Sequence, residues 1–145
     1  VGDAAQTTAS IGASYEVLTR VFLDANYRVS ENLYASIDPS RFNSATNKGT
    51  LELPSYGLMD AGFSYKMLVG KNNSNSLNFR LNVNNVLDEV YISESRTNIF
   101  ADDYVSGTSG PTWASSGQTY KGVANKNQVF FGYGRTWNFS LRYNF

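Results

Sequence analysis

The residues of this chain that could do chemistry are most concentrated in one polar segment of its second half. Asp102 and Asp103 stand side by side there, and carboxylates are ligands that calcium prefers. Two adjacent carboxylates lack the spaced ligand pattern of a calcium loop, so we expect no metal site and no cofactor. Four aromatic residues of this segment could instead stack on a sugar or close over a substrate: Phe100, Tyr104, Trp113 and Tyr120. The alternative, a loop that only covers the structure beneath it, is the one the sequence favours.

Composition argues against several classes of function. The 145 residues include 12 Lys and Arg, 12 Asp and Glu, no His and no Cys. Without Cys the chain can form no disulfide, and without His and Cys it lacks the usual zinc ligands. It also lacks the His base that activates a Ser nucleophile, so we expect that the protein is not an enzyme. A net charge of zero also argues against nucleic-acid binding, which needs a basic surface.

Five segments of the chain alternate between apolar and polar residues with a period of two, which predicts β-strands. They cover residues 9–17, 21–29, 58–67, 77–84 and 137–145. No apolar run approaches the roughly 18 residues of a membrane-spanning helix, but a barrel strand does not need one because only every second residue faces lipid.

The charged residues within these five segments all fall on the polar parity: Glu16, Asp24, Arg28, Asp60, Lys66, Arg80 and Arg142. The opposite parity is rich in aromatic residues: Tyr15, Tyr27, Phe63, Tyr65, Phe79, Trp137, Phe139, Tyr143 and Phe145. An Arg or Lys on a lipid-facing surface costs about 2–4 kcal/mol near the membrane midplane. This separation favours strands with one face in lipid, where the aromatic residues form girdles, and one face toward a wet lumen. A soluble antiparallel sandwich, which also alternates, is the alternative.

The connections between the predicted strands alternate in length. Residues 31–54 and 88–127 form long polar segments, whereas the other two connections are short. Outer-membrane barrels have long outer loops and short periplasmic turns, so we expect the carboxyl terminus on the periplasmic side. We expect the segment 88–127 to lack structure, and a structureless loop of about forty residues is uncommon in a soluble domain.

The number of predicted strands and the amino terminus both suggest a part of something larger. Five strands would leave two open edges in lipid, whereas bacterial barrels close with an even number. The chain begins at Val1 without a basic, apolar signal peptide, although export requires one. We therefore expect residues 1–145 to be the carboxyl-terminal portion of a larger outer-membrane barrel, or one piece of a split barrel.

Three segments resemble the TonB-dependent receptors. Leu81–Tyr91 contains Asn-Val-Leu-Asp-Glu-Val-Tyr and is similar to the N-(L/V)-(F/L)-D-x-x-Y segment at the outer end of their penultimate strand. Gly134–Trp137 is similar to the G-R-T-(F/W) entry to their last strand, and Leu141–Phe145 to their terminal L-x-Y-x-F. The clear match covers roughly the last seventy residues, and the upstream strands fit by pattern. The many Asn and Tyr residues resemble receptors from Bacteroidetes.

The resemblance implies an all-β fold, a transmembrane antiparallel barrel of 22 strands filled by an amino-terminal plug, to which this chain contributes about the last five strands. Such receptors sit in the outer membrane of Gram-negative bacteria and import ferric siderophores, haem, cobalamin or oligosaccharides. TonB supplies energy through a TonB box on the plug, and this chain contains neither plug nor box. Phe145 and the alternating aromatic end would also be read by the barrel-assembly machinery.

The resemblance also implies partners and leaves alternatives. The partners are outer-membrane lipid and lipopolysaccharide, the rest of the barrel and its plug, TonB through that plug, and in some receptors a surface lipoprotein. The seven charged residues would contact the plug or line a hydrated path, or form a mutually paired polar wall, which the sequence favours. A passive porin-like barrel is the first alternative for the whole chain, and a soluble all-β binding domain is the second.

Overall fold

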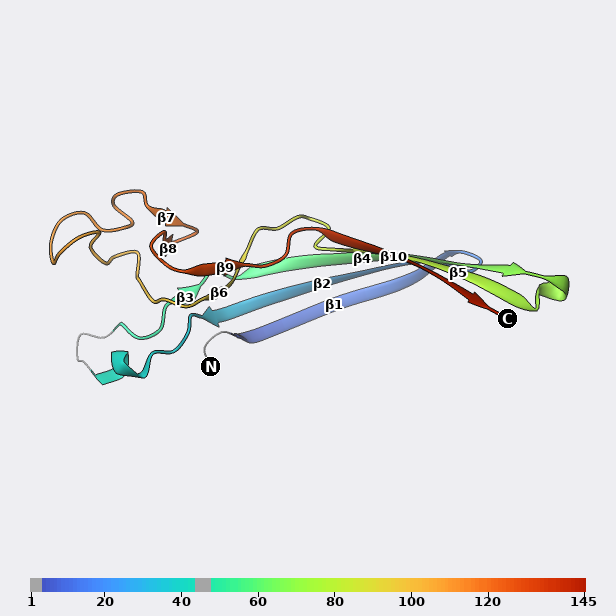
Figure 1. Ribbon diagram of the computed structural model, residues 1–145, viewed down its shortest axis with the longest axis horizontal. Coiled ribbons are helices and arrows are strands. Elements are labelled where there is room, and N and C mark those ends of the chain that lie inside the picture. Colours follow the sequence, from blue (N-terminus) through green and yellow to red (C-terminus); the bar gives the residue numbers. More distant parts are fainter. Residues whose placement is uncertain (1–3, 44–47) are drawn as a thin grey trace. The chain divides into compact units, whose positions relative to one another are not determined.

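The computed structural model describes residues 4–43 and 48–145 as an all-β protein with antiparallel sheets (Figure 1). The long strands are β1 (Ala5–Leu18), β2 (Val21–Tyr34), β4 (Tyr56–Val69), β5 (Asn75–Asn84) and β10 (Thr136–Asn144). The short strands are β3 (Glu52–Leu53), β6 (Ile92–Ser95), β7 (Thr119–Tyr120), β8 (Val123–Ala124) and β9 (Val129–Phe131). The 3-10 helices are η1 (Pro39–Asn43) and η2 (Lys71–Asn73). In the described part of the chain, neither helix is long and apolar enough to cross a membrane.

The five strands predicted from alternation are confirmed as β1, β2, β4, β5 and β10. Four of them are longer than predicted, because β1, β2 and β4 each contain 14 residues and β5 contains 10. In β2 the extension has a clear cause: Leu33 and Tyr34 pair with Leu53 and Glu52 of β3, so the backbone stays extended beyond the end of the regular alternation.

The long strands lie in one sheet in the order β1-β2-β4-β5-β10, with β3 beside β2. In the part of the chain that the structure describes, β1 and β10 are the outer strands and are not paired with each other. The predicted antiparallel all-β class is therefore confirmed, while β1 and β10 leave two sheet edges open.

The chain divides into two compact units. One unit, called here the loop unit, consists of Val1–Thr8, Ser30–Tyr56 and Val90–Gly132. The other, called here the sheet unit, consists of Ala9–Val29, Gly57–Glu89 and Tyr133–Phe145.

The loop unit has a small hydrophobic core of its own. The buried residues of this core are Leu33, Ala35, Leu51, Leu53, Ile92 and Val123. The Asn98 side chain links two other segments of this unit, because it accepts a hydrogen bond from the Leu51 amide at 2.8 Å and donates one to the Ser36 carbonyl at 2.8 Å. Strand β6 pairs with β9, and β7 pairs with β8.

The expectation that residues 88–127 lack structure is therefore wrong. Segment 31–54 begins with the end of β2 and contains β3, and segment 88–127 contains β6, β7 and β8. Residues 44–47 lie outside the described residues. Strands of two to four residues are too short to display an alternating pattern, and their apolar partners lie far apart in the sequence.

The sheet unit owes its two-sided character to its register. Leu81 of β5 lies opposite Phe63 of β4 and Phe139 of β10, and Phe79 lies opposite Tyr65 and Leu141. Because all these residues share one parity in register, the apolar side chains of three strands fall on one face of the sheet. The polar residues between them fall on the other face.

Candidate functional site

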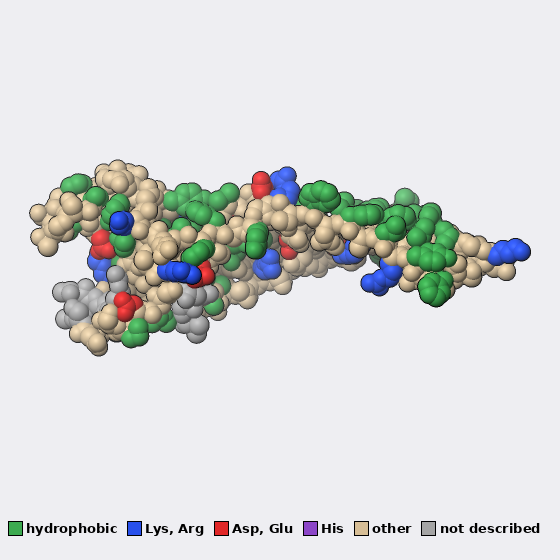
Figure 2. All heavy atoms as spheres, in the orientation of Figure 1, with side chains coloured by type: hydrophobic (Ala, Val, Ile, Leu, Met, Phe, Trp, Pro, Cys, Tyr) green, Lys and Arg blue, Asp and Glu red, His purple; other side chains and the backbone are tan. Residues whose placement is uncertain are grey.

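The apolar face of the sheet unit is exposed. Trp137 is 71% exposed and Phe139 57%, and Leu141 and Tyr143 are each at least half exposed. Tyr15 and Tyr27 on β1 and β2 are exposed as well, and Tyr65 stacks on Phe79 at a ring-centroid distance of 6.1 Å. Figure 2 shows hydrophobic side chains gathered over the surface near β5 and the carboxyl end.

This exposure bears on how the sheet is solvated. A sandwich in water buries its apolar face beneath a second sheet or a helix. In the sheet unit, no described element covers aromatic residues such as Trp137, Phe139 and Tyr143. A run of exposed aromatic side chains of this size marks a surface that meets lipid or another protein.

The polar face carries all seven charged residues that the alternation placed there. Arg80 Nη2 lies 2.9 Å from Asp24 Oδ1, and Arg28 Nη2 lies 3.8 Å from Asp60 Oδ2. Glu16 accepts a hydrogen bond from the Arg20 amide at 2.7 Å and so holds the β1–β2 turn. Partly exposed ion pairs of this kind stabilise a protein by roughly 0–1 kcal/mol each, so these two ion pairs add little to stability.

Gly62 makes possible the ion pair between Asp24 and Arg80, which joins two strands that are not neighbours. Asp24 lies on β2 and Arg80 on β5, with β4 between them. The Asp24 side chain crosses β4 at Gly62, where a Cβ atom would overlap its carboxylate. The Arg80 guanidinium also donates to Asn82 Oδ1 at 2.8 Å, which fixes its direction.

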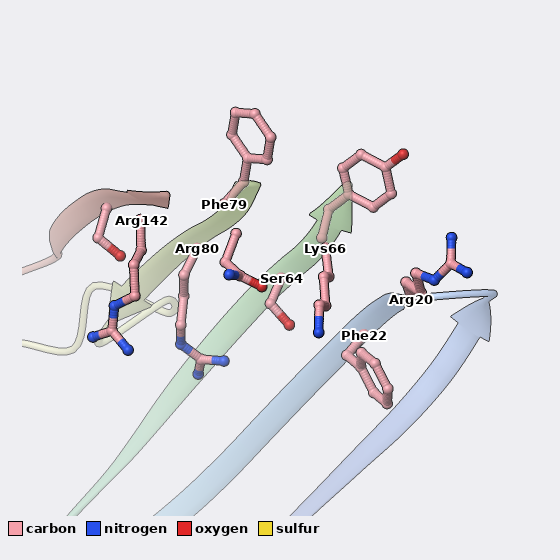
Figure 3. Close-up of a pocket in the computed structure, with 10 residues that line it drawn as sticks. Arg20, Phe22, Ser64, Lys66, Phe79, Arg80 and Arg142 are labelled. Atoms are coloured by element: carbon pink, nitrogen blue, oxygen red, sulfur yellow. The ribbon is translucent and has the colours of Figure 1, made fainter. Parts of the chain in front are cut away.

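A hollow of about 370 Å³ opens beside this pair, lined by residues of β2, β4, β5 and β10. In Figure 3, Lys66, Arg80 and Arg142 project to one side of the sheet together with Phe22, whereas Phe79 projects to the other. Sequence reasoning placed Lys66, Arg80 and Arg142 on this face but did not bring them together. It gave no role to Phe22, which also lines the hollow. An apolar residue at a polar position of the alternation was the signal that could have identified Phe22.

The segment that resembles the receptor motifs ties the two last strands together. Asn85 is buried, has a positive φ of 51°, and donates from its side chain to the carbonyls of Glu89 at 2.9 Å and Tyr133 at 3.3 Å. Asp88 accepts from the Arg135 amide at 2.9 Å. The Asn-Val-Leu-Asp segment therefore holds the entry to β10, which gives both sequence segments one structural role.

The four aromatic residues proposed as substrate contacts differ in exposure and in what they pack against. Phe100 packs partly buried against the core of the loop unit, and the Lys48 ammonium lies 5.5 Å from its ring centroid. Tyr104 is exposed and bridges to Thr112, while Trp113 is half-buried. Tyr120 is exposed and meets Phe131 edge to face at 5.7 Å. Of the four, Tyr104 and Tyr120 have the most exposed rings.

Asp102 and Asp103 both bind Lys48, which sequence reasoning did not single out because it lies more than fifty residues away. The Lys48 Nζ atom is 2.7 Å from Asp102 and 2.8 Å from Asp103. The hydrogen bond to Asp102, followed by that to Asp103, raises the pKa of Lys48, and the hydrogen bond from Lys48 lowers the pKa of Asp102. The two carboxylates thus connect the segment between β6 and β7 to Lys48, which precedes β3. Among the described residues, no group of three or more His, Cys, Asp or Glu could hold a metal ion.

Comparison of the chain with models of known protein families, with curated proteins and with solved structures found no match. The resemblance to TonB-dependent receptors therefore rests on the motif residues themselves.

Proposed function

We propose that this chain is the carboxyl-terminal part of the barrel of a TonB-dependent outer-membrane transporter, which imports a scarce nutrient into a Gram-negative bacterium. One observation carries the proposal: the sheet unit has an exposed aromatic face, and an opposite face holds the charged strand residues that lie within 9–29, 57–89 and 133–145. Lipid solvates the first face and water in the lumen solvates the second.

The open edges of the sheet support a larger barrel around it. Unpaired backbone groups on β1 and β10 would each cost several kcal/mol in lipid, so both strands need partners. In a barrel of 22 strands, β10 pairs with the first strand and β1 with the strand before it. Outer-membrane lipid, lipopolysaccharide and the barrel-assembly machinery are then the partners outside the barrel.

The motif residues support the TonB-dependent class over a plain channel. Asn85 and Asp88 belong to the first matching segment, and they hydrogen-bond to Tyr133 and to Arg135 at the entry of β10, where the second matching segment lies. The proposal places the plug and TonB box outside residues 1–145 and gives this chain no catalytic step. A surface lipoprotein over the loop unit is compatible with it.

Energy dependence of uptake tests this function. Cells that carry the intact protein should take up one of a panel of ferric siderophores, haem, cobalamin and oligosaccharides, and cells lacking the gene should not. Collapse of the proton gradient should stop that uptake. Uptake that continues without the gradient would instead assign the protein to the passive porin-like class.

A further inference from the structure

The hollow on the polar face of the sheet unit has an excess of positive charge. Lys66 of β4 and Arg142 of β10 both lie opposite Asn78 of β5, so they share one row across three strands. Neighbouring strands lie about 4.8 Å apart, so their Cα atoms are roughly 10 Å apart, within reach of two long side chains that bind one group. Arg80 lies in the next row, between Ser64 and Ser140.

Nearby carboxylates do not balance this charge. Asp24 is bonded to Arg80, Glu16 accepts from the backbone at the turn, and Asp60 is used by Arg28 and by the amide of Asn85. Within the described residues, the structure records no ion pair or side-chain hydrogen bond for Lys66 or Arg142. Both side chains are exposed on the surface of the sheet unit.

The remaining lining suits an oxyanion. Asn78 places an amide between Lys66 and Arg142, Ser64 and Ser140 place a hydroxyl on either side of Arg80, and Phe22 adds an apolar patch at the edge. A volume of about 370 Å³ falls within the roughly 300–1,000 Å³ range of small-molecule sites. Guanidinium and ammonium donors bind carboxylate and phosphate oxygens more strongly than neutral donors do.

We propose that Lys66, Arg142 and Arg80 form an anion-binding site on the polar face that takes a carboxylate or phosphate group. The inference rests on the proposed function in one respect, that this face borders a wet lumen. The anion is either part of a solute that passes along the wall or a carboxylate of a polypeptide that shares the lumen.

Competitive labelling of the intact protein in detergent tests the site. An amine-reactive ester is added in inorganic phosphate or in sodium chloride of equal ionic strength, and acylation of each Lys is measured by mass spectrometry. We expect phosphate to slow acylation of Lys66 by about threefold or more, because a bound anion keeps the amine protonated and shielded. Lys71, on the β4–β5 turn, is the internal reference and should react equally in both salts. Arg142→Gln should remove the protection of Lys66.

A second arm identifies a protein-borne anion. A carbodiimide condenses the Lys66 amine with any carboxylate in contact, with loss of water, and the linked peptide is then sequenced. Protection by phosphate supports a solute site, and an amide bond from Lys66 to a carboxylate outside this sheet supports a polypeptide ligand. Equal acylation in both salts without such a bond overturns the inference. An amide bond from Lys66 to Glu16, Asp24 or Asp60 also overturns it.

The two proposals fail separately. If Lys66 shows neither protection nor coupling in a protein that takes up its nutrient with energy from the proton gradient, only the anion site is wrong. If uptake persists without that gradient, the proposed function is wrong whatever Lys66 does.

Discussion

At the scale of single residues, Gly62 shows how one missing side chain decides a contact between distant strands. The Asp24 carboxylate reaches Arg80 across the space that a Cβ at Gly62 would fill. No pattern in the sequence pairs these three residues, since the sequence distance between Asp24 and Arg80 is 56. Alternation assigned each of them to a face, and only the register of β2, β4 and β5 brings them together.

Gly62→Ala should destabilise the protein by about 1 kcal/mol, because the added methyl displaces the Asp24 carboxylate from its partly exposed ion pair with Arg80. In an Asp24→Ala background the same change should cost less than about 0.5 kcal/mol, since nothing is left to displace. Urea unfolding of the intact protein in lipid vesicles, followed by tryptophan fluorescence, measures both values. An equal cost in the two backgrounds would show that Gly62 acts through another contact.

The contact of Lys48 with Asp102 and Asp103 should weaken both at alkaline pH and at acidic pH. Because the folded pKa of Lys48 is raised, its contribution is present below 10.5 and is lost as the pH rises through the folded pKa. Because the folded pKa of Asp102 is lowered, its contribution is present above 3.8 and is lost as the pH falls through the folded pKa. The contact should therefore hold across the neutral range and weaken in acid.

Hydrogen exchange in Lys48→Met tests this window. The amides of Trp113 and Ala114 bond to the carbonyls of Asp103 and Ala101, so they report on the loop. At pH 7 the variant should exchange faster than the wild type by up to about fivefold, the limit for an exposed ion pair, and near pH 2 the two should agree. Lys126→Met, an exposed Lys of the same unit, is the control and should match the wild type throughout. A difference between Lys48→Met and wild type that persists in acid would contradict the assignment.

At the scale of the elements, alternation predicted the long strands well and the loops poorly. The strands β1, β2, β4, β5 and β10 follow from a period of two sustained over eight or more residues. The core of the loop unit could not be predicted, because Leu33, Leu51 and Ile92 come from three separate segments. Strands such as β7 and β8 have only two residues each, so packing and turn geometry rather than periodicity place them.

The candidate site divides in the same way. The alternation alone placed Lys66, Arg80 and Arg142 on one face. That Lys66 and Arg142 lie in one row depends on how β4 and β10 are each aligned with β5. For the loop aromatic residues, the sequence could not show that Phe100 packs against the core of the loop unit and that Tyr120 packs on Phe131.

The placement of the connections predicts a membrane topology. The chain has no Cys, so single cysteines introduced at Ser116 and Ser74 report only on those sites within it. Ser116 lies in the segment between β6 and β7, and Ser74 in the turn between β4 and β5. In the intact protein, Ser116→Cys should react with an impermeant thiol reagent on whole cells, and Ser74→Cys only after the outer membrane is permeabilised. The reverse pattern would invert the topology.

At the scale of the whole molecule, the proposed barrel requires the last strand to pair with the first strand of the complete barrel. Phe145 is 98% exposed and its ring lies 6.2 Å from that of Tyr143, so it adds little to the packing of the described residues. Its expected roles are an interface anchor and a signal to the assembly machinery.

If the proposed function holds, deletion of Phe145 should lower the amount of assembled protein far more than the transport per assembled molecule. Phe145→Trp should be tolerated, because an aromatic anchor remains. Surface quantification together with uptake per molecule separates the two effects. Normal surface levels with lost uptake would assign the residue to transport instead.

The central claim is that the odd-numbered face of β5 and β10 meets lipid and the even-numbered face meets water. Leu81 and Asn82 are neighbours on β5, and they lie opposite Phe139 and Asn138 of β10. Each pair offers an arginine substitution on either face of the same strand, at nearly the same depth in the membrane.

The measurement that tests this claim most directly is the unfolding free energy of these four arginine variants of the intact protein in lipid vesicles. Heat-modifiable gel mobility confirms that each variant has folded. We predict that Leu81→Arg and Phe139→Arg lose about 2–4 kcal/mol, the cost of an Arg near the membrane midplane, and that Asn82→Arg and Asn138→Arg lose less than about 1 kcal/mol. Equal losses on the two parities, or a larger loss at Asn82 and Asn138, would contradict the account.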